Sequence, residues 1–279
     1  MRAGTDVLFH GVRGSSPVSG RDFAQFGGDT PAVEIASGET RIILDAGSGL
    51  RNVACTAADD AHLDIILSHY HYDHLIGFPF LAPAWRGKGR LTLWAPDFGE
   101  HAPRDILHGI LAPPYCPVGF GDFAMDVDII PYRPGASWRI GGVGVSTLSA
   151  DHPGGSASIR LSTRAGDAVY ATDMELGANG FLRELADFAS GADLVIADAM
   201  NDDANAEHRR GWGHSSWREA VELGAMARAK RLALFHHDPA MKDAALEYIE
   251  AKANELYDNA FSARQGAVVA LTPEPADAL

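Results

Sequence analysis

One short motif constrains this chain more than any other feature. Residues 68–74 read Ser-His-Tyr-His-Tyr-Asp-His and directly follow the apolar segment Leu-Asp-Ile-Ile-Leu, which predicts a strand. Alternate residues of an extended chain share a face, so His69 and His71 lie on one side, and a turn brings Asp73 and His74 beside them. Gathering three imidazoles and a carboxylate at one buried point without a metal would be costly. The motif therefore predicts a metal site at the end of a strand.

Nitrogen and oxygen atoms must supply the ligands of this site. The chain has two cysteines, Cys55 and Cys116, too few for a thiolate zinc site or a disulfide framework. Imidazole and carboxylate groups suit zinc, manganese, iron or nickel. Two such metals about 3.5–4 Å apart clamp both the attacking and the leaving oxygen in phosphoryl transfer.

Four side chains cannot saturate two metals, so further ligands must come from distant parts of the chain. Candidates follow other predicted strands: His152, Asp173 and the tandem pair His236-His237. A lone histidine is more often a surface or hydrogen-bonded residue than a ligand. We treat five histidines in that way: His10, His62, His101, His108 and His208.

Strand-length apolar segments dominate the first half of the chain and alternate with helical periodicity in the second. The predicted strands are 6–10, 32–36, 41–45, 63–67, 91–95, 127–130, 140–148, 158–161, 168–171, 194–197, 232–235 and 267–271, and the predicted helices are 180–188, 215–229 and 239–257. Ser215 or Ser216 is expected to cap the second helix. The Pro- and Gly-rich stretch 96–134 resists assignment, and the glycine-rich loop 11–30 is expected to be functional or mobile.

Length and composition set the remaining bounds. The 279 residues have the composition of an ordinary globular protein. We expect one domain over residues 1–271 and a flexible tail over 272–279. The formal charge of −14 argues against a large nucleic acid as partner, although a local basic patch remains open. No apolar run reaches the roughly 18 residues of a membrane span, and the N-terminus lacks a secretory signal pattern. We expect a soluble, cytoplasmic protein, with a homodimer as one open assembly state.

The order of these motifs resembles the metallo-β-lactamase superfamily over most of the chain. Asp45 matches the superfamily's early structural aspartate. The resemblance implies an α/β fold, a four-layer αββα sandwich. It also implies two divalent metal ions, zinc first with manganese or iron as alternatives. One metal is expected on His69, His71 and His152, the other on Asp73, His74 and His236, and Asp173 between them. His236 is preferred to His237 because it directly follows the late strand.

Several features indicate the branch of the superfamily. The best-known β-lactamases carry Cys where this chain has Asp173, and glyoxalase II-like thioesterases usually read Thr-Pro-Gly-His where this chain has Ser-Ala-Asp-His152. The better resemblance is to the phosphodiesterases, which include ribonuclease Z and the cyclic-phosphate diesterase of phosphonate breakdown. Gly211-Trp-Gly-His214-Ser-Ser resembles their extra histidine motif, and Gly11-x-Arg13-Gly-Ser15-Ser16 resembles their N-terminal substrate loop. On local grounds His214 could equally cap the helix that follows it.

The expected function is hydrolysis of a small or cyclic phosphodiester by attack of metal-bound hydroxide. The chain lacks the basic, glycine-rich arm with which ribonuclease Z grips tRNA. Asp73 is expected to orient the hydroxide, and His214 to act as general acid or phosphate clamp. Three alternatives stay open: a thioester or lactone hydrolase, a diiron redox or oxygen-binding protein, and a sensing module with a structural metal. The diiron proteins normally carry Glu where this chain has His71.

Overall fold

Two seven-stranded sheets form the centre of the molecule in the computed structural model, which describes residues 4–53, 62–177 and 180–272. In spatial order the first sheet contains β14 (Val268–Leu271), β1 (Thr5–Gly11), β2 (Ala32–Ser37), β3 (Thr40–Leu44), β4 (Leu63–Ile66), β5 (Arg90–Pro96) and β6 (Asp126–Tyr132). Strands β3 to β6 are parallel, and the β14-β1-β2-β3 pairs are antiparallel.

The second sheet repeats this mixed arrangement. In spatial order it contains β13 (Ala260–Ser262), β12 (Leu232–Phe235), β11 (Leu194–Asp198), β10 (Gly166–Ala171), β9 (Ser156–Thr163), β8 (Val143–Ala150) and β7 (Ser137–Ile140). Strands β10 to β13 are parallel, whereas the β7-β8-β9-β10 pairs are antiparallel. In each sheet the parallel strands direct their carboxyl ends to one edge.

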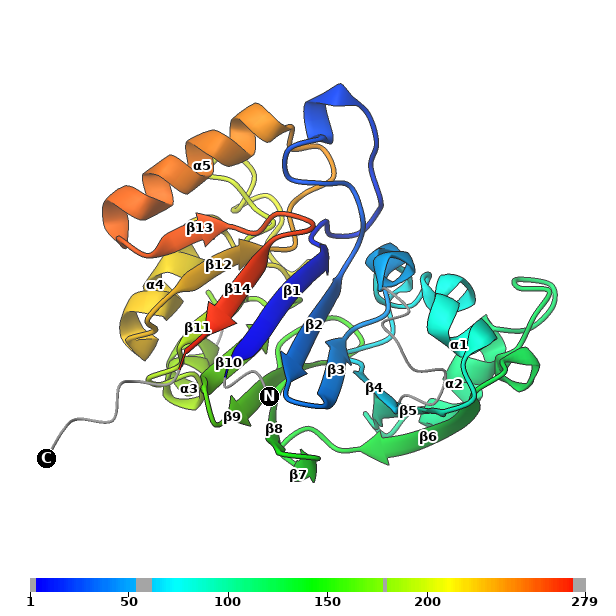
Figure 1. Cartoon of the computed structure of the whole chain (residues 1–279). Helices are drawn as coiled ribbons and strands as arrows, with labels where there is room; N and C mark the ends of the chain where they lie inside the picture. Colours follow the sequence, from blue (N-terminus) through cyan, green and yellow to red (C-terminus); the bar gives the residue numbers. More distant parts are fainter. Residues whose placement is uncertain (1–3, 54–61, 178–179, 273–279) are drawn as a thin grey trace, which may run out of the picture.

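Helices cover the outer face of each sheet, as Figure 1 shows. The α-helices are α1 (Ala82–Arg86) and α2 (Pro103–Ile110) beside the first sheet, and α3 (Phe181–Phe188), α4 (Trp217–Ala227) and α5 (Asp243–Leu256) beside the second. Short 3-10 helices are η1 (Arg21–Phe23), η2 (Ser48–Asn52), η3 (Tyr72–His74), η4 (Phe78–Phe80) and η5 (Phe120–Asp122). This order of layers confirms the predicted αββα sandwich. Within the described residues, no helix combines the length and apolar character needed to cross a membrane.

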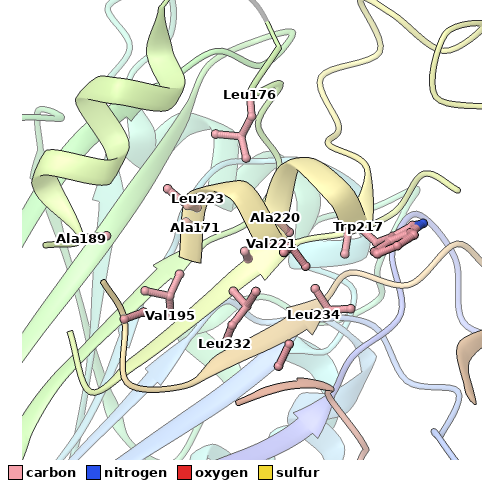
Figure 2. Close-up of a cluster of buried hydrophobic side chains, with 14 of the residues drawn as sticks. Ala171, Leu176, Ala189, Val195, Trp217, Ala220, Val221, Leu223, Leu232 and Leu234 are labelled. Carbon is pink, nitrogen blue, oxygen red and sulfur yellow. The ribbon is translucent and has the colours of Figure 1, made fainter. Parts of the chain in front are cut away.

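Three apolar clusters hold the four layers together. The middle cluster fills the space between the sheets, with Phe9 and Ile35 from the first and Ile159 from the second. A second cluster joins the first sheet to α1 and α2. The third joins the second sheet to α3, α4 and α5, and Figure 2 shows Leu232 of β12 close to Val221 of α4 within it. Each sheet is therefore apolar on both faces, and polar residues gather at the strand ends.

The structure differs from the predicted elements in a few places. The predicted strand 140–148 coincides with β8 from Val143 onward, but its first residue, Ile140, ends β7, because Gly141 adopts a left-handed φ of 52° in the turn between the two strands. Strand β13 and the helices α1 and α2 were not predicted, since their segments are short or rich in Pro and Gly. Ser216 caps α4, as one of the two predicted candidates, and exchanges hydrogen bonds with Glu219. The expected tail 272–279 lies outside the described residues apart from Thr272.

Truncation of a core side chain between β12 and α4 should destabilise the protein. We expect Leu234→Ala to lower the free energy of unfolding by about 2–5 kcal/mol, because this side chain is fully buried and its removal leaves a cavity. Leu256→Ala is the matched control: this leucine is 59% exposed, and its truncation should change stability by no more than about 0.5 kcal/mol. Urea unfolding of the metal-free protein measures both values. Similar losses in both variants would contradict this description of the core.

Candidate metal centre

Side chains from both sheets converge at one edge of the sandwich. All seven predicted ligand residues meet there. His69 and His71 follow β4, Asp73 and His74 lie in η3, His152 follows β8, Asp173 follows β10, and His236 follows β12. Strands that are distant in sequence place these residues together because their ends share the edge at which the two sheets meet. His71 is exposed, and the other six residues are buried.

The first group of side chains contains three histidines and one aspartate. Ligand-type atoms of His69, His71, His152 and Asp173 lie within 4.8 Å of one another. His71 Nδ1 is 3.0 Å from His152 Nε2. Asp173 Oδ1 lies 3.7 Å from His69 Nε2 and 3.8 Å from His152 Nε2. These separations leave room for one cation between three imidazole nitrogens and a carboxylate oxygen.

The second group contains Asp73, His74 and His236, again within 4.8 Å of one another. Asp73 Oδ2 is 3.3 Å from Nε2 of His74 and 3.3 Å from Nε2 of His236. The other oxygen of Asp173, Oδ2, lies 3.2 Å from His74 Nε2 and 3.3 Å from His236 Nε2. One oxygen of Asp173 thus faces each group, which is the geometry that a carboxylate bridging two cations requires.

Several of these rings already have their remaining nitrogen fixed by the protein. Nδ1 of His74 is 2.7 Å from Asp45 Oδ2, Nδ1 of His69 is 3.0 Å from Ser68 Oγ, and Nδ1 of His152 is 2.8 Å from the carbonyl of Gly213. Each contact leaves Nε2 turned towards the cluster with its lone pair available. Such contacts orient histidines that bind metals.

The donor set fits divalent cations better than it fits an apolar core. His69 Nε2, which faces the first group, is buried without a hydrogen-bond partner. Burial lowers the pKa of His69 well below its usual range, so this ring is neutral and can donate its lone pair. Burial also opposes a charge on His74, but the facing carboxylates, Asp173 first, raise the pKa of His74 well above its usual range. The centre therefore needs positive charge, which bound cations supply in place of that proton.

The carboxylate of Asp45 accepts several hydrogen bonds directly behind the second histidine group. It is fully buried and accepts hydrogen bonds from the Ser68 amide at 2.7 Å, the Ser68 hydroxyl at 2.8 Å and the Tyr170 hydroxyl at 2.8 Å, in addition to its contact with His74. Burial, with Asp45 nearby, raises the pKa of Tyr170 well above its usual range, so the hydroxyl remains a donor. Sequence reasoning found Asp45 but not Tyr170, which looks like an ordinary strand aromatic in the apolar run of β10.

Backbone conformation at the strand ends is also unusual. Asp45, Asp173 and His236 have φ values of 61°, 54° and 59°, in the left-handed region that non-glycine residues seldom adopt. Each residue directly follows a strand or stands two positions beyond one. Such strain costs on the order of 1 kcal/mol per residue and is common at functional sites. It turns each of these side chains from the strand direction into the centre.

His214 lies beside both groups, just before α4. Its ring stacks on His236 with centroids 5.0 Å apart, and its Nδ1 is 2.9 Å from Asp198 Oδ2. Burial disfavours a charge on this ring, but the Asp198 carboxylate outweighs that effect and raises the pKa of His214 to about 9. Nearby cations would act in the opposite direction. Because Asp198 occupies Nδ1, the Nε2 atom is the one free to act on a substrate.

Asp198 is a residue that sequence reasoning missed. It ends β11, is fully buried, and also accepts hydrogen bonds from the amides of Asp173 and Ser215. Its position after the apolar run Leu-Val-Ile-Ala was the available signal, as for the other strand-end residues. Asp198 and His214 also form a possible cation group with Asp173 and His236. The short contact between Asp198 and His214 instead assigns this aspartate to orienting the histidine.

The tandem histidines point in different directions. His236 joins the second group, whereas His237 is buried with its Nε2 2.9 Å from the carbonyl of Ala263. Burial lowers the pKa of His237 to about 3, so its ring is a neutral hydrogen-bonding group. Of the five histidines set aside as non-ligands, His10 contacts Glu34 and His62 contacts Thr92. None of the five belongs to a cation group among the described residues.

Known proteins share this architecture. Ribonuclease Z of Thermoplasma acidophilum is 22% identical over an alignment of 305 positions, which covers 93% of this chain and 95% of that protein. The crystal structure of the metallo-beta-lactamase fold protein YhfI from Bacillus subtilis superposes with a TM-score of 0.74 at 19% identity, over 96% of this chain and 99% of that one. A diphosphatase from the PhnP family gives a TM-score of 0.68 at 15% identity, with 95% and 97% covered.

The sandwich fold, the His/Asp cluster at the sheet edge and these relatives together define an enzyme of the metallo-hydrolase class. The beta-lactamase superfamily domain matches residues 40–237, which include all of the motif residues from Asp45 to His236. The chain therefore belongs to the beta-lactamase superfamily, as the resemblance of its motifs indicated.

The two tandem histidines provide an internal comparison. His236→Ala should lower zinc content, because its Nε2 faces Asp73 and Asp173, whereas His237→Ala should retain the metal content of the unmodified protein. Elemental analysis after dialysis against a weak chelator measures the difference. Circular dichroism controls for folding, since both rings are buried. Greater metal loss in His237→Ala would transfer the ligand role to that residue.

Proposed function

We propose that this enzyme is a dinuclear phosphodiesterase that acts on a small or cyclic phosphodiester. The observation that carries the proposal is the position of Asp173, with one oxygen towards each histidine group, next to a non-ligand histidine held by a carboxylate. Paired cations and a separate proton donor are the two components that cleavage of a phosphodiester needs. The ribonuclease Z relative acts on a substrate of this chemical class, as its name states.

In this proposal each group holds one cation. His69, His71 and His152 bind the first, Asp73, His74 and His236 bind the second, and Asp173 bridges them. Zinc suits this set of imidazole and carboxylate donors, with manganese or iron as alternatives. When bound, two such cations supply a water whose pKa is lowered towards neutrality and neutralise charge on a phosphate.

The protein's own side chains would then direct the reaction. Asp73 is buried and accepts from the Ser15 amide at 2.7 Å, which fixes its carboxylate and would allow it to orient the attacking water. His214 donates from Nδ1 to Asp198 and presents Nε2 to the leaving oxygen. The Asp198 carboxylate favours the protonated ring, as a general acid requires, and offsets the opposing effect of the proposed cations.

The charge of the protein favours a small substrate. The net charge of −14 opposes binding of a long polyanion. Arg209 and Arg210, in the loop before His214, already pair with Asp238 and Glu219. Neither guanidinium is therefore available as a free phosphate clamp.

We further propose that residues 1–271 form a single domain, because strands from both ends of the chain join the same sheet: β14 pairs with β1.

Turnover by the zinc-loaded protein tests the proposal. We expect about two zinc ions per chain and hydrolysis of cyclic and linear phosphodiesters in preference to thioesters and lactones. Asp173→Ala should lose most zinc and most turnover, because the carboxylate serves both cation positions. Thioester or lactone hydrolysis without phosphodiester hydrolysis would replace the proposal with a carbonyl hydrolase. Zinc binding without turnover of any of these substrates would favour a sensing module.

His214 allows a sharper test of the mechanism. His214→Ala should retain zinc and slow turnover by about 10²–10⁴-fold, as for other general acid–base groups. The loss should be smaller for bis(p-nitrophenyl) phosphate, whose leaving group needs little protonation, than for a cyclic or alkyl diester. His208→Ala is the control, because this histidine is exposed and outside every cation group. Equal losses on both substrates would indicate a phosphate clamp instead, and no loss would exclude a catalytic role.

A further inference from the structure

The N-terminal loop lies directly against the second histidine group. We use this name for residues 12–16, which follow β1. The Ser15 amide donates to Asp73 Oδ2 at 2.7 Å. A Cβ atom at Gly14 would come within 2.4 Å of His236 Nδ1, so the backbone of this glycine rests on the His236 ring. The loop therefore contacts two of the three proposed ligands of the second cation through its backbone.

The N-terminal loop is also paired with the segment that carries His236. The Gly14 amide donates to the carbonyl of His237 at 2.9 Å, and the His237 amide donates to the carbonyl of Val12 at 3.0 Å. Arg13 and His237 form an isolated parallel bridge. A shift of the loop would consequently be transmitted to the backbone next to His236, in addition to its effect on Asp73.

Arg13 anchors this loop from below. Its side chain is fully buried, and its guanidinium donates to the carbonyls of Gly27 at 2.8 Å and Met241 at 2.6 Å, with a longer contact of 3.3 Å to the carbonyl of Asp238. Asp243 Oδ1 lies 3.7 Å from Nη2. A buried guanidinium is expensive unless partners satisfy it, and here Nε and Nη1 are hydrogen-bonded whereas Nη2 has only the Asp243 carboxylate at ion-pair distance. Its planar fork joins the N-terminal loop to the chain that follows the late histidine, a geometry that lysine cannot reproduce.

The conformation of Ser15 shows that the loop must be held in place. Ser15 has a φ of 58°, in the left-handed region, and its side chain is exposed. The residue therefore contributes its amide to Asp73 while its hydroxyl lies at the rim. A non-glycine residue keeps this conformation only where neighbouring contacts enforce it. Arg13, two residues before Ser15, is itself fixed by hydrogen bonds to the carbonyls of Gly27, Asp238 and Met241.

We propose that Arg13 is a positioning residue that selectively sets the affinity of the second cation site. It acts through the Ser15 amide on Asp73 and through the Gly14 backbone on His236. The first group is oriented from elsewhere, because Ser68 holds His69 and the Gly213 carbonyl holds His152. Within the described residues, no hydrogen bond joins this loop to the side chains of His69, His71 or His152. This inference rests on the proposed ligand sets and not on the identity of the substrate.

Zinc competition tests the inference without any activity assay. Stepwise removal of zinc by a chromophoric chelator should give two affinities, which His71→Ala and His236→Ala assign to the first and second sites. Arg13→Lys keeps the charge but loses the fork, and Gly14→Ala places a methyl group on the His236 ring. Each should weaken the second site by about 10–100-fold, as loss of outer contacts does at other metal sites. The first site should change by less than about 3-fold.

Two matched variants control for general destabilisation. Arg160→Lys removes a guanidinium that likewise donates to backbone carbonyls, those of Phe188 and Ser190, and that pairs with Asp167 and with none of the proposed ligands. Gly109→Ala in α2 adds a methyl group with no atom within 4 Å. Both should retain both zinc affinities. Equal weakening of the two sites in Arg13→Lys, or unchanged affinities in folded Arg13→Lys and Gly14→Ala, would overturn the inference. If Arg13→Lys does not fold, Arg13→Gln, which keeps a planar donor for the same carbonyls, decides in its place, since Gly14→Ala tests only the contact of the loop with His236.

Discussion

The structure depends on the buried carboxylate of Asp173, at the point where the two sheets meet. One of its oxygens faces His69 and His152 and the other faces His74 and His236, at 3.2 to 3.8 Å. Burial alone would raise the pKa of Asp173, but the surrounding histidines hold it well below its usual range. A charge kept in so dry a place requires opposite charge beside it. The surrounding imidazoles and the cations that we propose can both supply this positive charge.

A shell of fixed contacts makes this concentration of polar groups possible. Asp45 holds His74 from one sheet and Tyr170 from the other, so a single carboxylate ties the two sheets below the centre. Asp198 has the corresponding role on the other side, where it holds His214 and the amide of Asp173. Left-handed backbone at Asp45 and Asp173 is tolerated because these contacts over-determine it. These hydrogen bonds across the sandwich therefore keep the strained backbone of Asp45 and Asp173 in place.

The histidines of the centre differ in what their two ring nitrogens contact. His69, His74 and His152 have Nδ1 occupied by the protein and Nε2 turned to the cluster, so they offer lone pairs. His214 is also held through Nδ1 by a carboxylate, as His74 is, but it belongs to neither proposed ligand group, so its Nε2 is left for another role. This contrast separates binding histidines from a proton-donating histidine within one cluster. The proposed phosphodiesterase mechanism depends on this difference.

The sequence by itself determined the fold family and most of the centre. The motif from His69 to His74 is compact, so strand periodicity and a turn are enough to predict its side-chain directions, and the apolar runs located most strands. Only the tertiary structure decided which of the two late histidines faces the centre, because a left-handed φ at His236 breaks the strand alternation there. It alone also revealed Tyr170, Asp198 and the anchoring of Arg13. Their roles come from contacts across the chain, such as Arg13 with Met241, which no local pattern encodes.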